Sequence, residues 1–483
     1  MSTTASRIYN PWVFLGIALL LSVAGLAALL TLGIKGAVII LAIIIGLPIV
    51  ILSFNSSKFA LYTGIAVGSF MFVIQRITGL YNAPLGLITD LVFLLSAVGV
   101  FWHKRSFRKD FLNPVTIAYF ITAIYYIIQV ANPAARGIQA WLVLGVRSIV
   151  SDVSLLIVCY FAIKSIADVK HLIYTFLAIA FLAGLYGVYQ EIVGLPDFDL
   201  RWISADEMRY KLTHIGGRFR KWSFFSNVSS YGVMMAYFSL VSIVLCLGDI
   251  RKRVRIVLLL GTMLMLMGMG YSGTRTAYVM VPIGFAFYAL LTINRPSTLI
   301  ASAVGAFGLV FILFGPVSGG TISRLRTAFE PTEDASYQVR EIKIARLRPY
   351  LWSHPMGGGI GSTLQGQKYH PGHPLAGFSP DSGYLFVGLE KGWIGLILLL
   401  VQNFVILSIG AKTYFRLQNP RLKNYLAAML TAFFAICVGH ISQNALGYLP
   451  ASIFHVVAIV CIFLFPQLDK FQNDYETISS TDD

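Results

Sequence analysis

Charged residues are scarce in this sequence. Only 12% of its 483 residues are Asp, Glu, Lys or Arg, whereas an ordinary soluble chain has about 25%, so the composition excludes a water-soluble globule. Cysteine is rare as well, and all four cysteines lie inside apolar runs: Cys159, Cys246, Cys437 and Cys461. Their positions exclude a disulfide framework and a zinc site of paired cysteines. Acidic residues are fewer than basic ones: the sequence has 21 Asp and Glu and 37 Lys and Arg, which gives a net charge of +16.

Long apolar runs are what the sequence does contain, since 57% of the residues are hydrophobic. A helix needs roughly 20 apolar residues to cross a membrane, and windows of this length predict an all-α, polytopic integral membrane protein with about 12–14 transmembrane helices. The first predicted span covers residues 12–32. The predicted regions are 1–193 (about seven transmembrane helices), 194–222 (an extracytoplasmic loop), 223–316 (central transmembrane helices), 317–383 (a large extracytoplasmic loop with short helices), 384–468 (C-terminal transmembrane helices) and 469–483 (a cytoplasmic tail).

The basic residues of the short loops predict the orientation. If the N-terminus is inside, the cytoplasmic loops contain clusters such as Lys104–Lys109 and Arg251–Arg255, whereas the short external loops contain few basic residues. Positively charged loops stay on the cytoplasmic side of a membrane. We therefore expect both termini in the cytoplasm and the two long loops outside.

Polar side chains inside the predicted spans gather in their outer half. Such groups are costly in hydrocarbon, so each is by default a candidate for function. Asn227, Arg147, Glu390 and His440 together predict a polar cavity that opens to the exterior and is closed to the cytoplasm. For any single residue the alternative is an interhelical hydrogen bond or a helix end near the headgroups.

Three arginines near the outer ends of spans are candidates for binding an anion. Arg275 lies in a tight turn between two apolar runs, and its planar guanidinium suits a bidentate grip on phosphate oxygens. Arg218 and Arg220 immediately precede a span, where guanidinium groups and exposed amide N–H groups form an anion site. The alternatives are an interface anchor for Arg275 and snorkelling to the interface for the other two.

The second long loop contains a glycine run and several histidines. Residues Gly357–Ser362 suit either a backbone nest for a phosphate or a structural turn, and they lack the Lys-Ser/Thr ending of a nucleotide-binding loop. His370 and His373 have too few neighbouring ligands for zinc, so a His or an Asp acting as general base is the better functional hypothesis. In the first long loop, Asp197 and Asp199 match a metal-binding acidic pattern only weakly. We predict no metal and no cofactor.

Three motifs follow one another late in the chain: residues 353–361 read SHPMGGGIG, residues 381–385 read DSGYL and residues 390–396 read EKGWIGL. Their order and spacing resemble the O-antigen ligase and polymerase superfamily, whose late loop reads P-l-G-x-G, then H-N-x-Y-L, then E-x-G-l-i-G-L. The resemblance covers roughly residues 218–400, and the earlier spans only by hydropathy. Ser272–Arg275 is similar to the family's S-G-S-R, and Arg220 and Arg340 resemble two further family arginines.

The resemblance implies a multi-pass glycosyltransferase of the cytoplasmic (inner) membrane with an extracytoplasmic active site in the large loop. Its donor would be a polyprenyl-diphosphate-linked oligosaccharide such as an undecaprenyl one. Acceptor glycan, membrane lipids and polysaccharide assembly proteins would be its other partners, with no nucleic acid. Arg275, Arg220, Arg218 and Arg340 would bind the diphosphate while an acceptor hydroxyl displaces it with inversion and without a metal.

The resemblance leaves the base and the acceptor open. Where the ligases have His, this chain has Asp381, so the base is Asp381, His373 or His370. Asp381 favours a polymerase of O-antigen or exopolysaccharide, and a ligase that attaches glycan to lipid A core or to protein is the alternative. A flippase or exporter of lipid-linked sugars is the alternative of another class, and it predicts polar groups in both halves of the membrane and short external loops.

Overall fold

The protein is built almost entirely of α-helices in the computed structural model, which describes residues 34–81, 83–215, 217–316, 326, 344–345 and 347–481. The α-helices in these residues are α2 (Ile34–Asn55), α3 (Ser57–Thr78), α4 (Gly86–Trp102), α5 (Pro114–Ile128), α6 (Val146–Ala162), α7 (Ile166–Ile192), α8 (Asp197–Ser204), α9 (Glu207–Thr213), α10 (Val228–Cys246), α11 (Lys252–Ser272), α12 (Arg275–Leu291), α13 (Pro296–Phe314), α16 (Gly366–Tyr369), α17 (Gly383–Arg416), α18 (Pro420–Gly439) and α19 (Ala451–Thr481). A π-helical turn, Trp141–Gly145, leads into α6, and three short 3-10 helices are η1 (Lys109–Phe111), η2 (Gln129–Ala131) and η5 (Ala445–Gly447). Strands β1 (His214–Ile215) and β2 (Arg218–Phe219) form an antiparallel hairpin in which His214 lies opposite Phe219.

The predicted all-α polytopic fold is confirmed. Within the described residues, ten helices are long and apolar enough to cross a membrane, and three apolar helical stretches are shorter. The predicted regions 1–193, 223–316 and 384–468 contain these helices, whereas the first predicted span, residues 12–32, lies outside the described residues. The central region predicted to begin at Ser223 has its first helix at Val228, because residues 223–227 form turns and bends.

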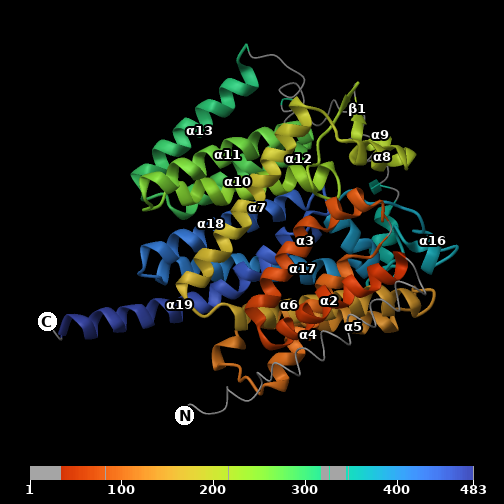
Figure 1. The fold of residues 1–483 in the computed structure, drawn as a ribbon, viewed down its shortest axis with the longest axis horizontal. Coiled ribbons are helices and arrows are strands. Elements are labelled where there is room, and N and C mark those ends of the chain that lie inside the picture. Colours follow the sequence, from red (N-terminus) through yellow and green to blue (C-terminus); the bar gives the residue numbers. More distant parts are fainter. Residues whose placement is uncertain are drawn as a thin grey trace.

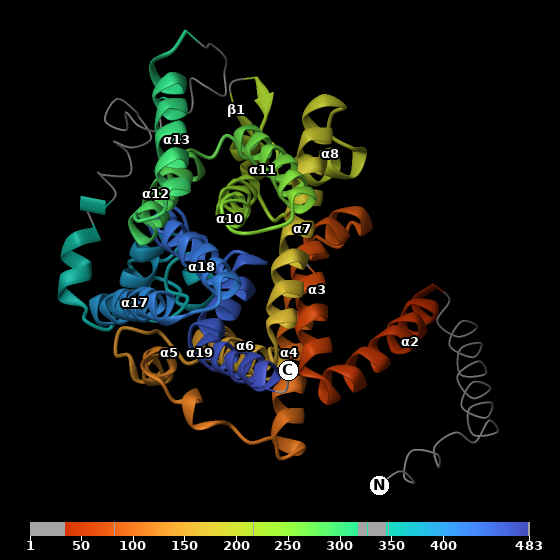
Figure 2. The same ribbon diagram turned by 90° about the vertical axis from the view of Figure 1, so that its left-hand side faces the viewer.

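Helix α10 forms the centre of the bundle. Of its apolar, membrane-spanning stretch, 89% is buried inside the bundle, and α10 packs against α7, α11, α12 and α18. Helix α13, with only 6% of its apolar stretch buried, lies at the periphery of the bundle (Figure 1). Figure 2 shows α2 projecting at another edge, where it contacts α3 and α4.

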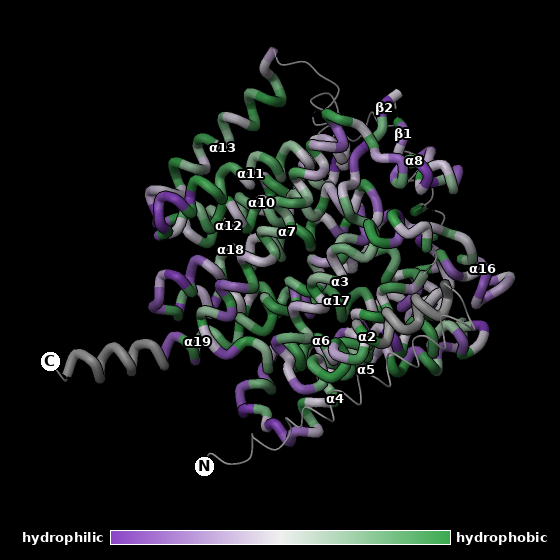
Figure 3. Tube along the Cα trace, viewed as in Figure 1, coloured by the Kyte–Doolittle hydropathy of each residue, from purple (hydrophilic) through white to green (hydrophobic). Residues whose placement is uncertain are grey.

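Hydrophobic residues fill the middle of the bundle, and hydrophilic segments gather at its two ends (Figure 3). One end contains the short loops that precede α7, α11 and α18. There Ser165 caps α7 by accepting a hydrogen bond from Asp168 N at 3.2 Å, and Asn419 caps α18 by accepting one from Arg421 N at 2.9 Å. The other end contains α8, α9, the β1–β2 hairpin and the loop before α17, which we call together the loop layer.

Arg76, near the end of α3, fixes the loop layer to the bundle. Its side chain is only 1% exposed, and its Nε lies 3.0 Å from Asp199 Oδ1 in α8. Its two terminal nitrogens donate to the carbonyl oxygens of Phe225 and Ser223 at 2.9 and 2.7 Å. Gln190 Nε2 donates to the second oxygen of Asp199 at 2.9 Å. Because these partners occupy Asp199, its carboxylate serves the attachment of the loop layer.

Candidate functional site

A cavity of about 710 Å³ opens where the loop layer meets the ends of α10, α11 and α18. Segments far apart in the sequence form its walls: α8 and α9, the start of α10, the turn between α11 and α12, and the loops next to α17 and α18. We call it the arginine cavity. Its polar lining residues include Asp206, Arg209, Arg220, Asn227, Thr274, Arg275, Thr276, Asp381, Gln443 and Tyr448.

The turn between α11 and α12 places Arg275 in the cavity wall. Helix α11 ends at Ser272, Gly273 has a left-handed backbone with φ 59°, and α12 begins at Arg275. Glycine adopts that conformation without the strain that a Cβ atom would bring. Thr274 N donates to Ser272 Oγ at 3.2 Å, and Thr274 Oγ1 donates to the carbonyl of Val228 at 3.1 Å. These bonds tie the turn to the start of α10 and leave Arg275 half-buried at the cavity.

Arg220 forms hydrogen bonds to the same turn. Its Nε donates to the Ser272 carbonyl at 2.7 Å and its Nη2 donates to Thr274 Oγ1 at 3.1 Å. Its Nη1 reaches the Leu212 carbonyl in α9 at 3.3 Å. The guanidinium therefore links the loop layer to the turn that carries Arg275, and it lies in the same cavity wall.

Asp381 reaches the arginine cavity from the loop before α17. The next residue, Ser382, caps α17 by accepting a hydrogen bond from Leu385 N at 3.3 Å. Gly383 N donates to the carbonyl of His440 at 2.9 Å, which joins this segment to the end of α18. Asp381 is exposed, so its carboxylate is accessible from the cavity.

Tyr448 lines the cavity beside Asp381. Burial, and to a smaller extent the Asp381 carboxylate, raises the pKa of Tyr448 to about 12. The phenol is therefore protonated at neutral pH and able to donate a hydrogen bond into the cavity.

The structure brings four of the predicted site residues together: Arg220, Asn227, Arg275 and Asp381 all line the arginine cavity. Asn227 is also the N-cap of α10, where its Oδ1 accepts a hydrogen bond from Ser230 N at 2.8 Å. Arg218 is exposed in β2 and is not among the lining residues. Arg340 lies outside the described residues.

The glycine run is part of a loop next to α17, residues 354–375, which we call the glycine–histidine loop. Backbone amides of this loop hydrogen-bond to the side chain of Glu390 in α17, which is only 3% exposed. Glu390 accepts hydrogen bonds from Gly361 N at 3.0 Å, Thr363 N at 3.3 Å and Thr363 Oγ1 at 2.6 Å. The amides that would form a phosphate nest thus bind acceptors of the protein itself: Gly361 N binds the Glu390 carboxylate, and Gly358 N and Gly359 N bind the carbonyls of Leu389 and Glu390, which favours the structural turn over the phosphate nest.

Gly392 allows the loop to approach α17 closely. Its φ is 71°, and a Cβ atom built there would lie 1.8 Å from the carbonyl oxygen of Pro355. A residue with a side chain would therefore both strain the backbone and collide with the loop. The family-like motifs at residues 353–361 and 390–396 are in this way packed on each other.

His370 and His373 lie in the glycine–histidine loop and are not among the residues that line the arginine cavity. The His370 ring accepts a hydrogen bond from Arg136 N at 2.9 Å, and its other nitrogen lies 2.9 Å from the Ile360 carbonyl. The His373 ring accepts one from Leu375 N at 3.1 Å and contacts the Tyr350 hydroxyl at 3.3 Å. Burial, together with the nearby His370, Arg136 and His354, lowers the pKa of His373.

The remaining predicted cavity residues lie elsewhere. Arg147 forms an ion pair of 2.5 Å with Asp90 of α4, and it lines a separate cavity of about 470 Å³ together with Glu390. His440 packs against Gly383, where a Cβ atom would come within 2.0 Å of its ring. The predicted single polar cavity is thus divided between two cavities and a packing contact.

Several lining residues were not singled out from the sequence as site residues. Trp202 of α8 lies under the guanidinium of Arg209, whose Cζ is 4.3 Å from the ring centre, and Tyr448 comes from the loop between α18 and α19. Arginine and tryptophan in a loop are common, so no local pattern distinguishes them. Among the residues that the structure describes, no group of three or more His, Cys, Asp or Glu side chains is arranged to hold a metal ion.

Residues 260–400 match the family model described as O-Antigen ligase. The chain is therefore similar to O-antigen ligases. The matched segment runs from α11 into α17, and so contains Arg275, Asp381 and the glycine–histidine loop, whereas Arg220 and Asn227 precede it. The match confirms the predicted resemblance to the O-antigen ligase and polymerase superfamily and supports a membrane function of the ligase or polymerase type. No curated protein matches the chain.

Proposed function

We propose that this chain is a glycosyltransferase of the cytoplasmic membrane that polymerises glycan repeat units from an undecaprenyl-diphosphate-linked donor at the outer face. The observation that carries the proposal is the arginine cavity, which Arg275 and Asp381 both line as residues of a segment similar to O-antigen ligases. A guanidinium that grips a diphosphate and a carboxylate that accepts a proton are the two groups that this transfer requires.

In the proposed reaction, a hydroxyl of the acceptor sugar attacks the anomeric carbon of the donor. The new C–O bond forms on the face opposite the breaking bond between that carbon and the diphosphate oxygen, so the configuration inverts. Asp381 accepts the hydroxyl proton, and the polyprenyl diphosphate leaves with the electron pair. Arg275 stabilises the negative charge that develops on the leaving diphosphate.

Arg220 is a positioning residue in this proposal. Its guanidinium donates to two groups of the α11–α12 turn, the Ser272 carbonyl and Thr274 Oγ1. Asn227 and Tyr448 line the same cavity and are placed to hydrogen-bond sugar hydroxyls. A polymerase is favoured over a ligase because the acidic residue Asp381 occupies the position where the ligases have histidine.

The test is Arg275→Ala and Asp381→Ala in a strain that lacks the native protein, with the length of the surface glycan measured by gel electrophoresis. Both variants are expected to lose long glycan chains, by a factor of about 100 or more for the general base, at a normal amount of membrane protein. Matched controls are Arg201→Ala and Asp197→Ala, because both residues are exposed in α8 and do not line the cavity. Chains of wild-type length in both test variants would contradict the transferase proposal.

The other functions give different outcomes in the same strains. Glycan caps of a single repeat indicate a polymerase, whereas complete loss of attached glycan indicates a ligase. Accumulation of donor in the cytoplasmic leaflet indicates an exporter. With purified protein and a polyprenyl-diphosphate donor, transfer is expected to continue in the presence of a chelator, and its abolition would contradict the metal-independent reaction.

A further inference from the structure

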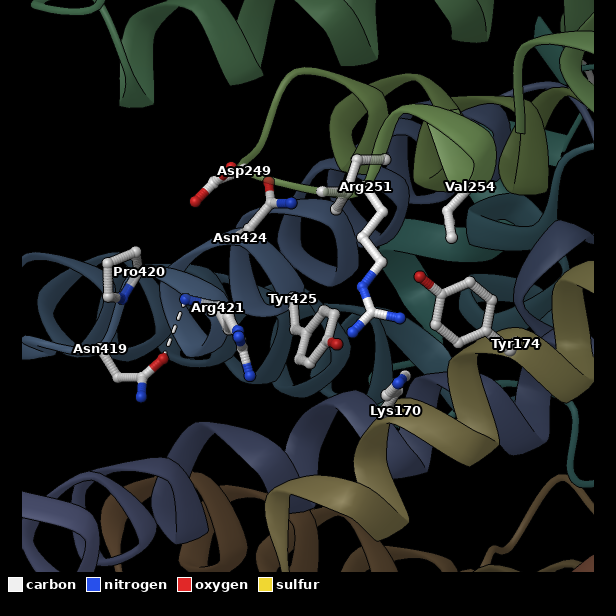
Figure 4. A pocket seen from close by; sticks show the side chains of 11 residues that line it. Lys170, Tyr174, Asp249, Arg251, Val254, Asn419, Pro420, Arg421, Asn424 and Tyr425 are labelled. Carbon is white, nitrogen blue, oxygen red and sulfur yellow. Dashed lines mark hydrogen bonds between the residues drawn. The ribbon is translucent and has the colours of Figure 1, made fainter. Parts of the chain in front are cut away.

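A second polar cavity lies at the opposite end of the helices that reach the arginine cavity. It measures about 480 Å³ and lies between the beginnings of α7, α11 and α18, and we call it the basic cavity (Figure 4). Lys170 contributes from α7, Asp249 and Arg251 from the loop before α11, and Arg421 and Asn424 from α18.

Helix length places the two cavities at opposite membrane surfaces. Helix α11 begins next to the basic cavity and ends at Ser272, beside the arginine cavity. Its 21 residues, with a rise of about 1.5 Å each, span about 30 Å, which is the thickness of the hydrocarbon core. The basic cavity therefore lies at headgroup depth, on the face whose loops are rich in Lys and Arg.

Three cations converge on this cavity. In Figure 4 the guanidinium of Arg251 extends between the rings of Tyr174 and Tyr425 towards Lys170, and Arg421 extends from α18 nearby. Within the described part of the chain, the side chains of Lys170, Arg251 and Arg421 form no ion pair. Asp249 is the one carboxylate among the lining residues, so the cations outnumber it and repel one another, and a bound anion relieves that repulsion.

The backbone adds to the positive potential. Helix α11 starts directly after Arg251 and has no side-chain cap, so the N–H groups of its first turn have no side-chain acceptor. Helix α18 also begins at the cavity wall, at Pro420. The N-terminal ends of helices carry a partial positive charge that favours an anion such as a phosphate.

A carboxylate in the same wall indicates that the ligand also has a hydrogen-bond donor. Asp249 is exposed in the loop before α11 and lies close to Asn424 at the cavity, as Figure 4 shows. Asn424 packs beneath this loop, where its Nδ2 donates to the Leu245 carbonyl at 3.3 Å and its Oδ1 is buried. Three cations against one carboxylate favour an anionic ligand over a zwitterionic one, and the exposed carboxylate favours a ligand with a hydroxyl group.

The exposed surface of α11 suits the acyl chains of a lipid. Val257 follows the cavity-lining Val254 by about one helical turn on the same face of α11 and is 58% exposed. A soluble phosphate compound would gain nothing from this apolar surface, whereas a diacyl lipid would cover it. Basic pockets between transmembrane helices at this depth suit anionic lipid headgroups.

We propose that the basic cavity binds the headgroup of an anionic phospholipid with a glycerol hydroxyl, as in phosphatidylglycerol. Lys170, Arg251 and Arg421 contact the phosphodiester, and the Asp249 carboxylate accepts a hydrogen bond from the headgroup hydroxyl. This proposal is independent of the chemistry at the arginine cavity.

The test uses the purified full-length chain in a neutral detergent and titrates dioleoylphosphatidylglycerol, dioleoylphosphatidylethanolamine or dioleoylphosphatidylcholine. Native mass spectrometry counts the bound lipid, and the melting temperature reports stabilisation. Phosphatidylglycerol is expected to bind preferentially, and Arg251→Gln or Lys170→Gln is expected to weaken its binding about fivefold per charge removed. The matched control is Arg253→Gln, because Arg253 is exposed in the first turn of α11 but does not line the cavity.

Three results would overturn the proposal. The first is equal binding of the three lipids by the wild-type protein. The second is unchanged binding of phosphatidylglycerol by Arg251→Gln, Lys170→Gln and the double variant. The third is stabilisation by glycerol phosphate or inorganic phosphate that equals stabilisation by the lipid, because the cavity would then bind a soluble phosphate. If a variant fails to fold, Arg421→Gln replaces it, and the lipid preference of the wild-type protein is measured independently.

Discussion

The arginine cavity and the glycine–histidine loop both include residues of the family-like segment, yet their charged groups differ in exposure. In the loop, the Glu390 carboxylate and the His370 ring form hydrogen bonds to backbone groups of the protein. In the arginine cavity, Arg275 and Asp381 line open space of about 710 Å³. The difference teaches that a motif can be distinctive because it folds a loop, while the proposed catalytic groups lie beside it.

Burial explains why the two regions differ. Glu390 is 3% exposed, and a carboxylate at that depth is tolerated only when donors surround it. The glycine–histidine loop supplies those donors, since Gly361 N and the Thr363 amide and hydroxyl all donate to it. Asp381 is exposed and retains access to a substrate.

The largest expected effect is a loss of stability in Glu390→Ala. The change leaves two amides and a hydroxyl buried without an acceptor, which costs about 1–3 kcal/mol for each group that finds no other partner, and about 3–5 kcal/mol in all. Thermal unfolding in detergent measures it as a lower melting temperature and less folded protein. Asp381→Ala is the matched contrast and is expected to melt like the wild type. Equal melting of the two variants would remove the distinction between the regions.

A smaller loss of stability is expected in His370→Phe. Phenylalanine fills a similar volume but leaves Arg136 N–H without its acceptor, at a cost of about 1–3 kcal/mol. The folded fraction should still transfer glycan at a rate near that of the wild type. The measurement is the transfer rate divided by the amount of folded protein, and its collapse in His370→Phe at normal stability would assign the base to His370 rather than Asp381.

Much of the fold was predictable because a run of about 20 apolar residues predicts a transmembrane helix without any knowledge of its tertiary contacts. The helices α7 and α13 follow directly from runs of apolar residues, and they end at Ile192 and Phe314, within two residues of the predicted region limits at 193 and 316. The site was predictable only in part. Arg275 and Asp381 could be proposed through the family resemblance, but nothing local indicates that Asp381 faces the turn after α11.

Long-range contacts account for what the sequence did not predict. Arg76 and Asp199 are an ordinary helix-end arginine and a loop aspartate in the sequence, and become a buried ion pair only when α8 folds onto α3. Glu390 was predicted to line the polar cavity because it is an ionisable residue within a predicted span. Its donors come from the glycine–histidine loop, and only the folded loop shows that they reach it.

The smallest expected effect is on the pH dependence of stability, through His373. Its pKa is lowered by burial and by the nearby His370, Arg136 and His354, so the folded state binds fewer protons than the unfolded state, whose histidine titrates near pH 6.5. Stability is therefore expected to fall as the pH drops through about 6.5 and below, and to recover above it. The melting temperature between pH 5 and 8 measures the slope, and His373→Gln should flatten it, whereas the exposed His171→Gln should not. If His373 were instead the general base, His373→Gln would abolish transfer at every pH, and the glycine–histidine loop would have to be counted as part of the active site.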